Sequence, residues 1–211
     1  MPHKLPRGLY ALLDDSVRAE LTMVEKARLV IEAGVGVLQL RLEQTHDRQA
    51  LPIIREVVAL AAPRGVKVIV NDRVDLALAG GASGVHLGAD DLPVDVARRL
   101  LGPEALIGAT TRSLEDIVRA QSLGADHVGL GPIFQTSTKV VGVPPMGLER
   151  FGHIATASPL PVVGIAGITL ATIGQVARAG ARAAAVAGDL LKADDVVSRA
   201  RALQGAFSTP R

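Results

Sequence analysis

Residues 70–91 read VNDRVDLALAGGASGVHLGADD, and this stretch decides the fold. Its pattern predicts a strand, a short helix and a second strand, at 66–70, 74–79 and 84–87. Each strand is apolar on both faces, as in a buried parallel sheet, and each leads into a carboxylate, Asp72 after the first and Asp91 after the second. Parallel α/β folds place their chemistry at these carboxyl ends of strands.

The same alternation continues along the rest of the chain. We expect further strands at 9–13, 35–40, 105–109, 127–130, 161–165 and 183–187, and further helices at 22–32, 51–62, 94–101, 114–123, 148–157, 171–179 and 193–203. A weak repeat supports this order, in EAGVGVLQL, AGGASGVHLG, SLGADHVGLG and RAGARAAAVAG. Eight such units predict one α/β domain over residues 1–211, a closed (β/α)8 TIM barrel, with a loose tail after about residue 205. The first strand lacks a following GxGxxG, which disfavours an open dinucleotide-binding sheet.

Composition excludes several classes of function. The charge of +2 is the difference between 23 basic and 21 acidic residues, and only 2% of residues are aromatic, so nucleic-acid binding is not expected. No apolar run reaches the length of a membrane span, and the chain has no secretory signal pattern, so we expect a cytoplasmic protein. Zero cysteines exclude disulfides and a cysteine nucleophile.

Asp72 and Asp91 are candidate ligands of a hard divalent cation, above all Mg²⁺. Two neighbouring strand ends would present these carboxylates across one mouth of the barrel. The alternative is structural: Asp72 caps the helix that follows it, and the pair Asp90-Asp91 caps the helix after Pro93. The spacing alone leaves both interpretations open.

Other polar groups stand where the remaining strands end. Arg41 and Lys139, together with a metal ion, would hold a polyanion such as diphosphate, and Gly167 and Gly188 stand where barrels bind a phosphate through backbone N–H groups. The same rim would carry Gln39, Asn71, His86, Thr110, Thr136 and Thr138.

Each of these residues also has a structural interpretation. Arg41 could pair with Asp72, Lys139 could be a solvated loop residue, and Gly167 could serve only a tight turn. His86 and Gln39 could be hydrogen-bonded polar residues of the barrel interior, and the other histidines, including His127, are interpreted as structural or surface residues.

Several motifs resemble those of the thiamine-phosphate synthases, a family that also contains thiazole tautomerases. They are QLR at 39–41, NDRVDLALA at 71–79, GVHLGADDLP at 84–93, IGATTRS at 107–113, ADHVGLGPIFQTSTK at 125–139 and PMGLE at 145–149. The resemblance covers nearly the whole chain. It implies a (β/α)8 transferase that joins a hydroxymethylpyrimidine diphosphate to a thiazole phosphate with Mg²⁺ and releases diphosphate.

The resemblance also implies a role for each rim residue. Asp72 and Asp91 would hold Mg²⁺. The diphosphate would contact Arg41, Asn71, Thr110 and Lys139. Gln39 and His86 would orient the aminopyrimidine, and the thiazole phosphate would face Thr136, Thr138, Gly167 and Gly188. A homo-oligomer is compatible with this family.

The chain departs from the family pattern at several positions. Glu43 replaces a diphosphate-binding lysine, which changes the local charge by two units. Ala166 and Gly188 stand where the family usually has Gly and Ser, and Arg112 replaces a His. Glu43 therefore keeps a non-catalytic phosphate-binding homologue open, and His86 keeps a thiazole tautomerase open. Pro132 stands where tautomerases tend to carry His, which favours the synthase.

Overall fold

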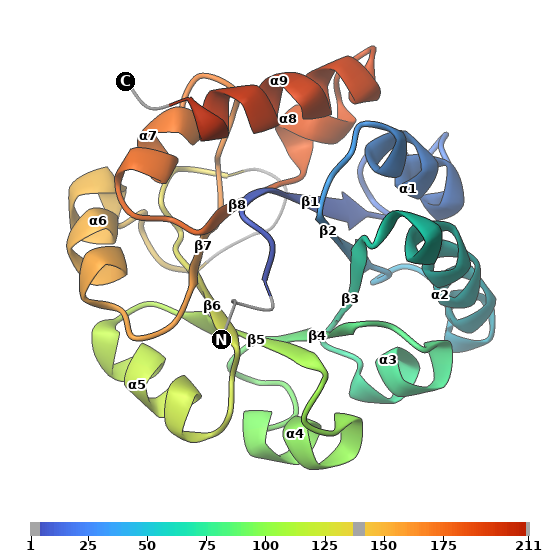
Figure 1. Cartoon of the computed structure of the whole chain (residues 1–211), viewed down its shortest axis with the longest axis horizontal. Helices are drawn as coiled ribbons and strands as arrows, with labels where there is room; N and C mark the ends of the chain where they lie inside the picture. Colours follow the sequence, from blue (N-terminus) through green and yellow to red (C-terminus); the bar gives the residue numbers. More distant parts are fainter. Residues whose placement is uncertain (1–4, 137–141, 210–211) are drawn as a thin grey trace.

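The parallel strands of the chain close into a barrel. The structure is a computed structural model that describes residues 5–136 and 142–209. Every strand pairs in parallel with the next one in sequence, and β8 pairs with β1 (Figure 1). The strands are β1 (Gly8–Asp14), β2 (Val37–Arg41), β3 (Lys67–Asn71), β4 (Gly84–Leu87), β5 (Leu106–Thr111), β6 (His127–Leu130), β7 (Val162–Gly164) and β8 (Ala183–Val186). The predicted single-domain (β/α)8 barrel is confirmed.

Helices surround this barrel on its outer face (Figure 1). They are α1 (Met23–Glu32), α2 (Asp47–Ala61), α3 (Val74–Gly80), α4 (Val94–Leu101), α5 (Leu114–Ser122), α6 (Gly147–Ala157), α7 (Ile173–Arg178), α8 (Gly188–Leu191) and α9 (Val196–Ser208). A short 3₁₀ turn, η1 (Ala62–Arg64), follows α2. The first turns of α1 and α5 carry capping boxes, built by Thr22 with Glu25 and by Ser113 with Asp116. The short helix α8 is absent from the sequence-based prediction.

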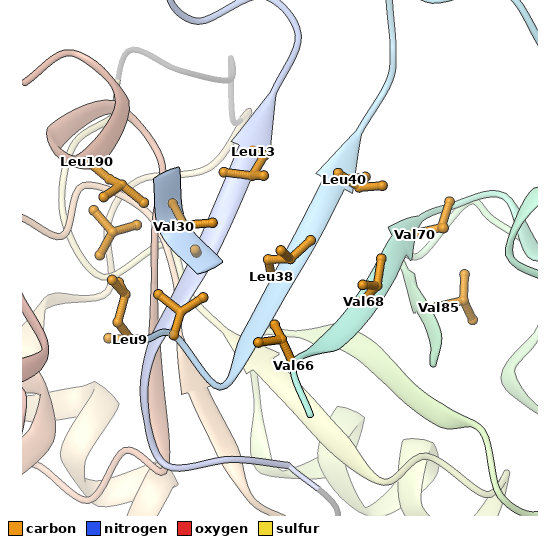
Figure 2. Close-up of a cluster of buried hydrophobic side chains, with 14 of the residues drawn as sticks. Leu9, Leu13, Val30, Leu38, Leu40, Val66, Val68, Val70, Val85 and Leu190 are labelled. Carbon is orange, nitrogen blue, oxygen red and sulfur yellow. The ribbon is translucent and has the colours of Figure 1, made fainter. Parts of the chain in front are cut away.

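The main hydrophobic core lies between the barrel and its helices. Outward-facing aliphatic side chains of β2 and β3, such as Leu38, Leu40 and Val68, are fully buried in it (Figure 2). Val30 of α1 belongs to the same cluster. Burying one such side chain contributes about 1.5 to 3 kcal/mol. This layer fixes the strands and leaves the barrel mouth available for polar residues.

A second cluster fills the lower barrel interior. It is made of Leu5, Tyr10, Val37, Ile69, Leu106, Val163 and Ala183. Glycines border this interior where space is short: a Cβ on Gly84 would stand 1.9 Å from the Leu106 carbonyl oxygen. Large side chains thus close the bottom of the barrel, while small ones leave a cavity above them.

The last helix extends beyond the sequence-based prediction. A loose tail after residue 205 was expected, but α9 continues to Ser208. Phe207 is the cause, because its side chain is buried in the main core and Arg7 lies over its ring at 5.3 Å. The prediction of a loose tail is therefore wrong up to Ser208.

We expect Phe207→Ala to lower the free energy of unfolding by about 3 to 4 kcal/mol, because the substitution leaves a cavity in the core. Urea denaturation followed by circular dichroism measures this loss. Thr209→Ala, at the exposed end of the same helix, is the control and should change stability by less than about 0.5 kcal/mol. A loss below about 1 kcal/mol for Phe207→Ala would mean that the helix end is not anchored.

Candidate active site

The carboxyl ends of the strands surround a cavity of about 590 Å³. Strands β1 to β8 all run parallel, so these ends lie on one rim, opposite the plugged bottom of the barrel. Many of the residues predicted from the sequence line this cavity: Gln39, Arg41, Asn71, His86, Thr110, Thr136, Gly167 and Gly188. Barrel closure therefore brings together residues that are up to 149 positions apart in the sequence.

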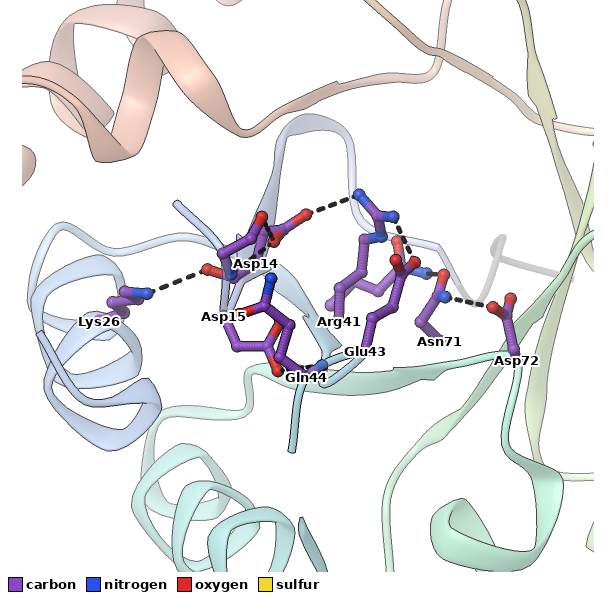
Figure 3. A network of polar contacts seen from close by, with 10 residues as sticks. Asp14, Asp15, Lys26, Arg41, Glu43, Gln44, Asn71 and Asp72 are labelled. Atoms are coloured by element: carbon purple, nitrogen blue, oxygen red, sulfur yellow. Dashed lines mark hydrogen bonds and ion pairs between the residues drawn. The ribbon is translucent and has the colours of Figure 1, made fainter. Parts of the chain in front are cut away.

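A hydrogen-bonded row of side chains crosses from β2 to β3. The Gln39 Nε2 donates to Asn71 Oδ1 at 3.0 Å. The Asn71 Nδ2 then donates to Asp72 Oδ2 at 2.6 Å (Figure 3). The two bonds fix the amide of Asn71 and hold one oxygen of Asp72 at the end of β3.

Arg41 is held between two carboxylates (Figure 3). Its Nη1 donates to Asp14 Oδ2 at 2.7 Å, and both side chains are nearly inaccessible, at 7% and 5% exposure. Its Nη2 donates to Glu43 Oε1, and the Glu43 side chain is 50% exposed. The sequence analysis offered Asp72 as the structural partner of Arg41, whereas in the structure Arg41 forms its ion pairs with Asp14 and Glu43. Glu43 therefore turns inward onto the rim arginine.

His86 and Thr110 form a polar pair on β4 and β5. The His86 Nε2 lies 3.0 Å from Thr110 Oγ1, and one of the two atoms donates to the other according to the imidazole tautomer. The strand register explains the pair, because His86 aligns with Gly108 and Thr110 stands two residues further along the same face. Both side chains line the cavity.

Asp72 and Asp91 follow neighbouring strands. The Asp72 N–H donates to the His86 carbonyl at 2.8 Å, and Asp72 adopts a positive φ of 60°, an uncommon conformation for a residue other than glycine. One oxygen of Asp91 accepts the Gly88 N–H at 2.6 Å. Asp72 lines a second groove beside the main cavity, together with Glu43.

Helix capping does not account for the two carboxylates. The N-caps of α3 and α4 are Arg73 and Pro93, and within the described residues neither helix receives a side-chain bond from its cap. The structural interpretation offered by the sequence, in which Asp72 and Asp91 serve as caps, is therefore wrong.

The donor chemistry at this edge fits a magnesium ion that is shared with a substrate. In the parts of the chain that the structure describes, no group of three or more His, Asp or Glu residues could enclose a metal ion. Mg²⁺ is commonly bound by one or two carboxylates, with water and substrate phosphate oxygens completing the octahedron. Asp72, hydrogen-bonded to Asn71 after β3, and Asp91 after the neighbouring β4 match that mode and not an all-protein cage. Asp91 lines neither the main cavity nor the second groove.

Two glycines lie at the ends of β7 and β8. Gly167 has φ of 68°, and a Cβ there would stand 2.3 Å from the Gln135 carbonyl oxygen, so only glycine fits. The preceding Ala166 also has a positive φ, 72°, a conformation that favours glycine. Gly188 is the first residue of α8. Asp189 Oδ2 accepts the Leu170 N–H at 3.2 Å and thus joins the loops after β7 and β8.

Two of the predicted site residues belong to the segment between Thr136 and Gly142. Thr138 and Lys139 lie outside the described residues, so their proposed contacts stay predictions. Thr136, just before them, lines the cavity.

Sequence reasoning missed the floor of the cavity. Tyr10 and His127 both line it and both are fully buried. His127 was interpreted as a structural or surface histidine because its spacing to other histidines suggests no ligand set. Its position at the start of the apolar strand β6 could have indicated that it is buried. Side chains alternate between the two faces of a strand, so one set of β6 residues points into the barrel.

Fold and site together define a (β/α)8-barrel protein with a polar cavity at the carboxyl ends of its strands, the arrangement of barrel enzymes. The profile of the thiamine monophosphate synthase family matches residues 9–190. The chain belongs to this family.

Known relatives are similar to this chain over almost its full length. A thiamine-phosphate synthase of Myxococcus xanthus is 50% identical over 100% of this chain and 96% of its own length. The thiamine-phosphate synthase of Anaeromyxobacter dehalogenans is 49% identical over 97% of this chain and 89% of its own length. A solved thiamine phosphate pyrophosphorylase from Pyrococcus furiosus superposes with a TM-score of 0.85 at 32% identity, covering 95% of each chain.

We expect His127 to destabilise the fold in acid. Burial and the neighbouring His86 lower the pKa of His127 from 6.5 to about 3, so below pH 6.5 the unfolded chain takes up a proton that the folded chain rejects. The free energy of unfolding should then fall by up to about 1.4 kcal/mol per pH unit between pH 6.5 and 3 from this group. Urea denaturation at pH 7 and pH 5 measures it. His127→Phe should lose less stability than the wild type over this interval, and an equal loss would contradict the pKa.

Proposed function

We propose that this chain is a thiamine-phosphate synthase. As a transferase, it joins 4-amino-2-methyl-5-hydroxymethylpyrimidine diphosphate to thiazole phosphate, and it forms thiamine phosphate and diphosphate. The observation that carries the proposal is that one cavity is lined by an arginine, amides, hydroxyls and glycines from most strands of the barrel or the loops that follow them. The full-length identity to named synthases supports the same reaction.

The reaction we propose begins at the pyrimidine methylene. The bond between this carbon and the diphosphate oxygen breaks, and its electron pair leaves with the diphosphate. The thiazole nitrogen then donates its lone pair to the pyrimidine-methyl cation and becomes the thiazolium nitrogen of the product. No protein nucleophile is needed, so the chain has to stabilise the leaving group and align two rings.

Each rim residue has one proposed task in this scheme. Arg41, Asn71, Thr110 and Lys139 hold the diphosphate by charge and hydrogen bonds. Gln39 and His86 orient the aminopyrimidine. The thiazole phosphate is taken up by Thr136, Thr138, Gly167 and Gly188.

Asp72 and Asp91 would hold Mg²⁺ in this proposal. When bound, the ion would neutralise charge that develops on the departing diphosphate. The hydrogen bond from Asn71 to Asp72 would then have two effects. It fixes a carboxylate that would hold the metal ion, and it orients the Asn71 side chain toward the diphosphate.

Glu43 weakens the attraction between Arg41 and an anion. Asp14 and Glu43 together offset the guanidinium charge before any substrate arrives. Asp14 is buried and remains in place, whereas the half-exposed Glu43 can rotate away from Arg41. We therefore propose that the diphosphate displaces Glu43, which lowers affinity but does not abolish binding.

Location and assembly belong to the proposal as well. No helix in residues 5–136 or 142–209 has the length and apolarity to cross a membrane. We propose a cytoplasmic enzyme that acts on small molecules, in keeping with a chain that has no cysteines. The homo-oligomer that is compatible with the family stays a prediction.

The direct test incubates the purified protein with both phosphorylated precursors and Mg²⁺. Chromatography should detect thiamine phosphate and diphosphate in equal amounts. Failure to form thiamine phosphate at high enzyme concentration would refute the synthase proposal. Isomerisation of a thiazole phosphate that needs no metal and survives Asp72→Ala would indicate a tautomerase instead, and tight binding without product would indicate a phosphate-binding homologue.

We expect Glu43→Lys to lower the KM for the pyrimidine diphosphate roughly 3- to 10-fold, because a competing carboxylate becomes a cation at a partly exposed site. Glu43→Gln should give a smaller decrease. Glu104→Lys makes the same charge change in the exposed turn before β5, on the far side of the barrel, and serves as the control. An unchanged KM in Glu43→Lys would show that Glu43 lies away from the bound anion.

We expect Asp72→Asn and Asp91→Asn each to raise the Mg²⁺ concentration for half-maximal activity by roughly tenfold or more. A titration of activity with Mg²⁺ after chelation measures the change. Asp90→Asn removes the exposed neighbouring carboxylate and should leave the titration as in the wild type. Equal titrations for all three variants would rule out a metal at Asp72 and Asp91.

A further inference from the structure

We propose that Tyr10 and His127 form an uncharged hydrogen-bonding floor that recognises the nitrogen-bearing edge of the pyrimidine ring, with His127 as a specificity-determining residue. The proposal rests on the synthase function proposed above, because it assigns a second polar contact to one of that reaction's substrates. Tyr10 and His127 are thus added to the proposed substrate-binding residues, with no contact to a phosphate or to the metal ion.

The first observation is a set of buried polar atoms without protein partners. Three buried atoms of these two side chains have no hydrogen-bond partner within residues 5–136 and 142–209. They are Tyr10 Oη and both ring nitrogens of His127. Leaving a buried polar atom unsatisfied costs about 1 to 3 kcal/mol, and folded proteins seldom tolerate it without a function. Three such atoms in two touching side chains indicate a site that a ligand completes.

The second observation is where these atoms lie. Both residues line the cavity that also holds Gln39 and His86. The ring of His127 lies 6.2 Å from that of Tyr10 and 6.0 Å from that of His86, measured between centroids. The three rings therefore form a continuous patch below the rim.

Glycine at position 108 makes room for two of these rings. A Cβ on Gly108 would stand 2.4 Å from His127 Nε2 and 2.5 Å from His86 Nδ1. Any other residue there would displace both imidazoles. Glycine at this position therefore lets both imidazoles pack against the backbone of β5, and this close packing fixes the two rings side by side.

The floor is polar but carries no charge. Burial lowers the pKa of His127 to about 3 and raises that of Tyr10 above its usual range, so both are neutral at physiological pH. A neutral imidazole has one N–H donor and one acceptor nitrogen, and the phenol supplies another donor. An aminopyrimidine edge, with ring nitrogens that accept and an amino group that donates, complements this set, whereas a phosphate does not.

Neutrality also suits the proposed reaction. The pyrimidine ring becomes a cation when the diphosphate leaves, and a charged imidazolium beneath it would oppose that step. The floor can hold the ring in place through hydrogen bonds without adding positive charge. The cationic groups stay at the rim, where Arg41 faces the leaving group.

The experiment compares Tyr10→Phe and His127→Phe, which remove the polar atoms and keep ring-sized side chains. We expect the KM for the pyrimidine diphosphate to rise about 3- to 10-fold in each, with the KM for thiazole phosphate changed less than twofold. His153→Phe makes the same change on the exposed surface of α6 and should leave both constants unaltered. A KM for the pyrimidine substrate within twofold of the wild type in both variants would overturn the proposal, as would a rise for thiazole phosphate alone.

A binding measurement separates this proposal from the synthase function. The unphosphorylated pyrimidine alcohol is added to the ¹⁵N-labelled wild-type protein, and the imidazole nitrogens of its five histidines are observed by NMR. The His127 nitrogens should shift on binding and those of His153 should not. A shift without any product in the enzyme assay would retain the floor and reject the synthase, and an unmoved His127 in an active enzyme would do the reverse.

Discussion

The parallel register of the closed barrel is the constraint on which the site depends. Because each strand from β1 to β8 runs in the same direction, residues that follow strands far apart in the sequence reach one rim. The energy for this arrangement comes from the aliphatic layer between strands and helices, which is separate from the rim. Polar and charged groups can therefore gather at the mouth without weakening the core that holds them.

Electrostatics at the rim follow from how Arg41 is held. A buried guanidinium needs a partner of opposite charge. The nearly inaccessible carboxylate of Asp14 is such a partner, with its Oδ2 2.7 Å from Arg41 Nη1. Asp14 is itself fixed, because its side chain accepts from Ser16 and its carbonyl accepts from the buried Lys26 at 3.0 Å (Figure 3). Burial lowers the pKa of Lys26, although the charges of nearby carboxylates oppose that shift. The network holds the arginine in position, and the ion pair with Glu43 offsets part of its charge.

The fold could be predicted from the sequence because its signals are local. Short apolar runs, glycine stops and amphipathic helices each report on their own segment, and their eightfold alternation leaves few architectures. Eight of the predicted site residues line the cavity for the same reason, since the end of a strand can be located in the sequence. Partners across the barrel were not predictable: the pairing of Arg41 with Asp14 depends on the β1–β2 register, in which these two residues align. The burial of His127 and the anchoring of Phe207 likewise depend on packing between distant elements, which no local pattern reports.

The central proposal is that the rim of the barrel holds the diphosphate between Arg41, which lines the main cavity, and the carboxylates of Asp72 and Asp91 after β3 and β4. A crystal structure of the protein with the pyrimidine diphosphate and Mn²⁺ in place of Mg²⁺ tests it most directly, because Mn²⁺ can be located by its anomalous scattering. The account predicts a Mn²⁺ peak in contact with Asp72 and Asp91, with the diphosphate beside Arg41 and Glu43 turned away. Diphosphate bound away from this rim, or Mn²⁺ with neither carboxylate as a ligand, would contradict it.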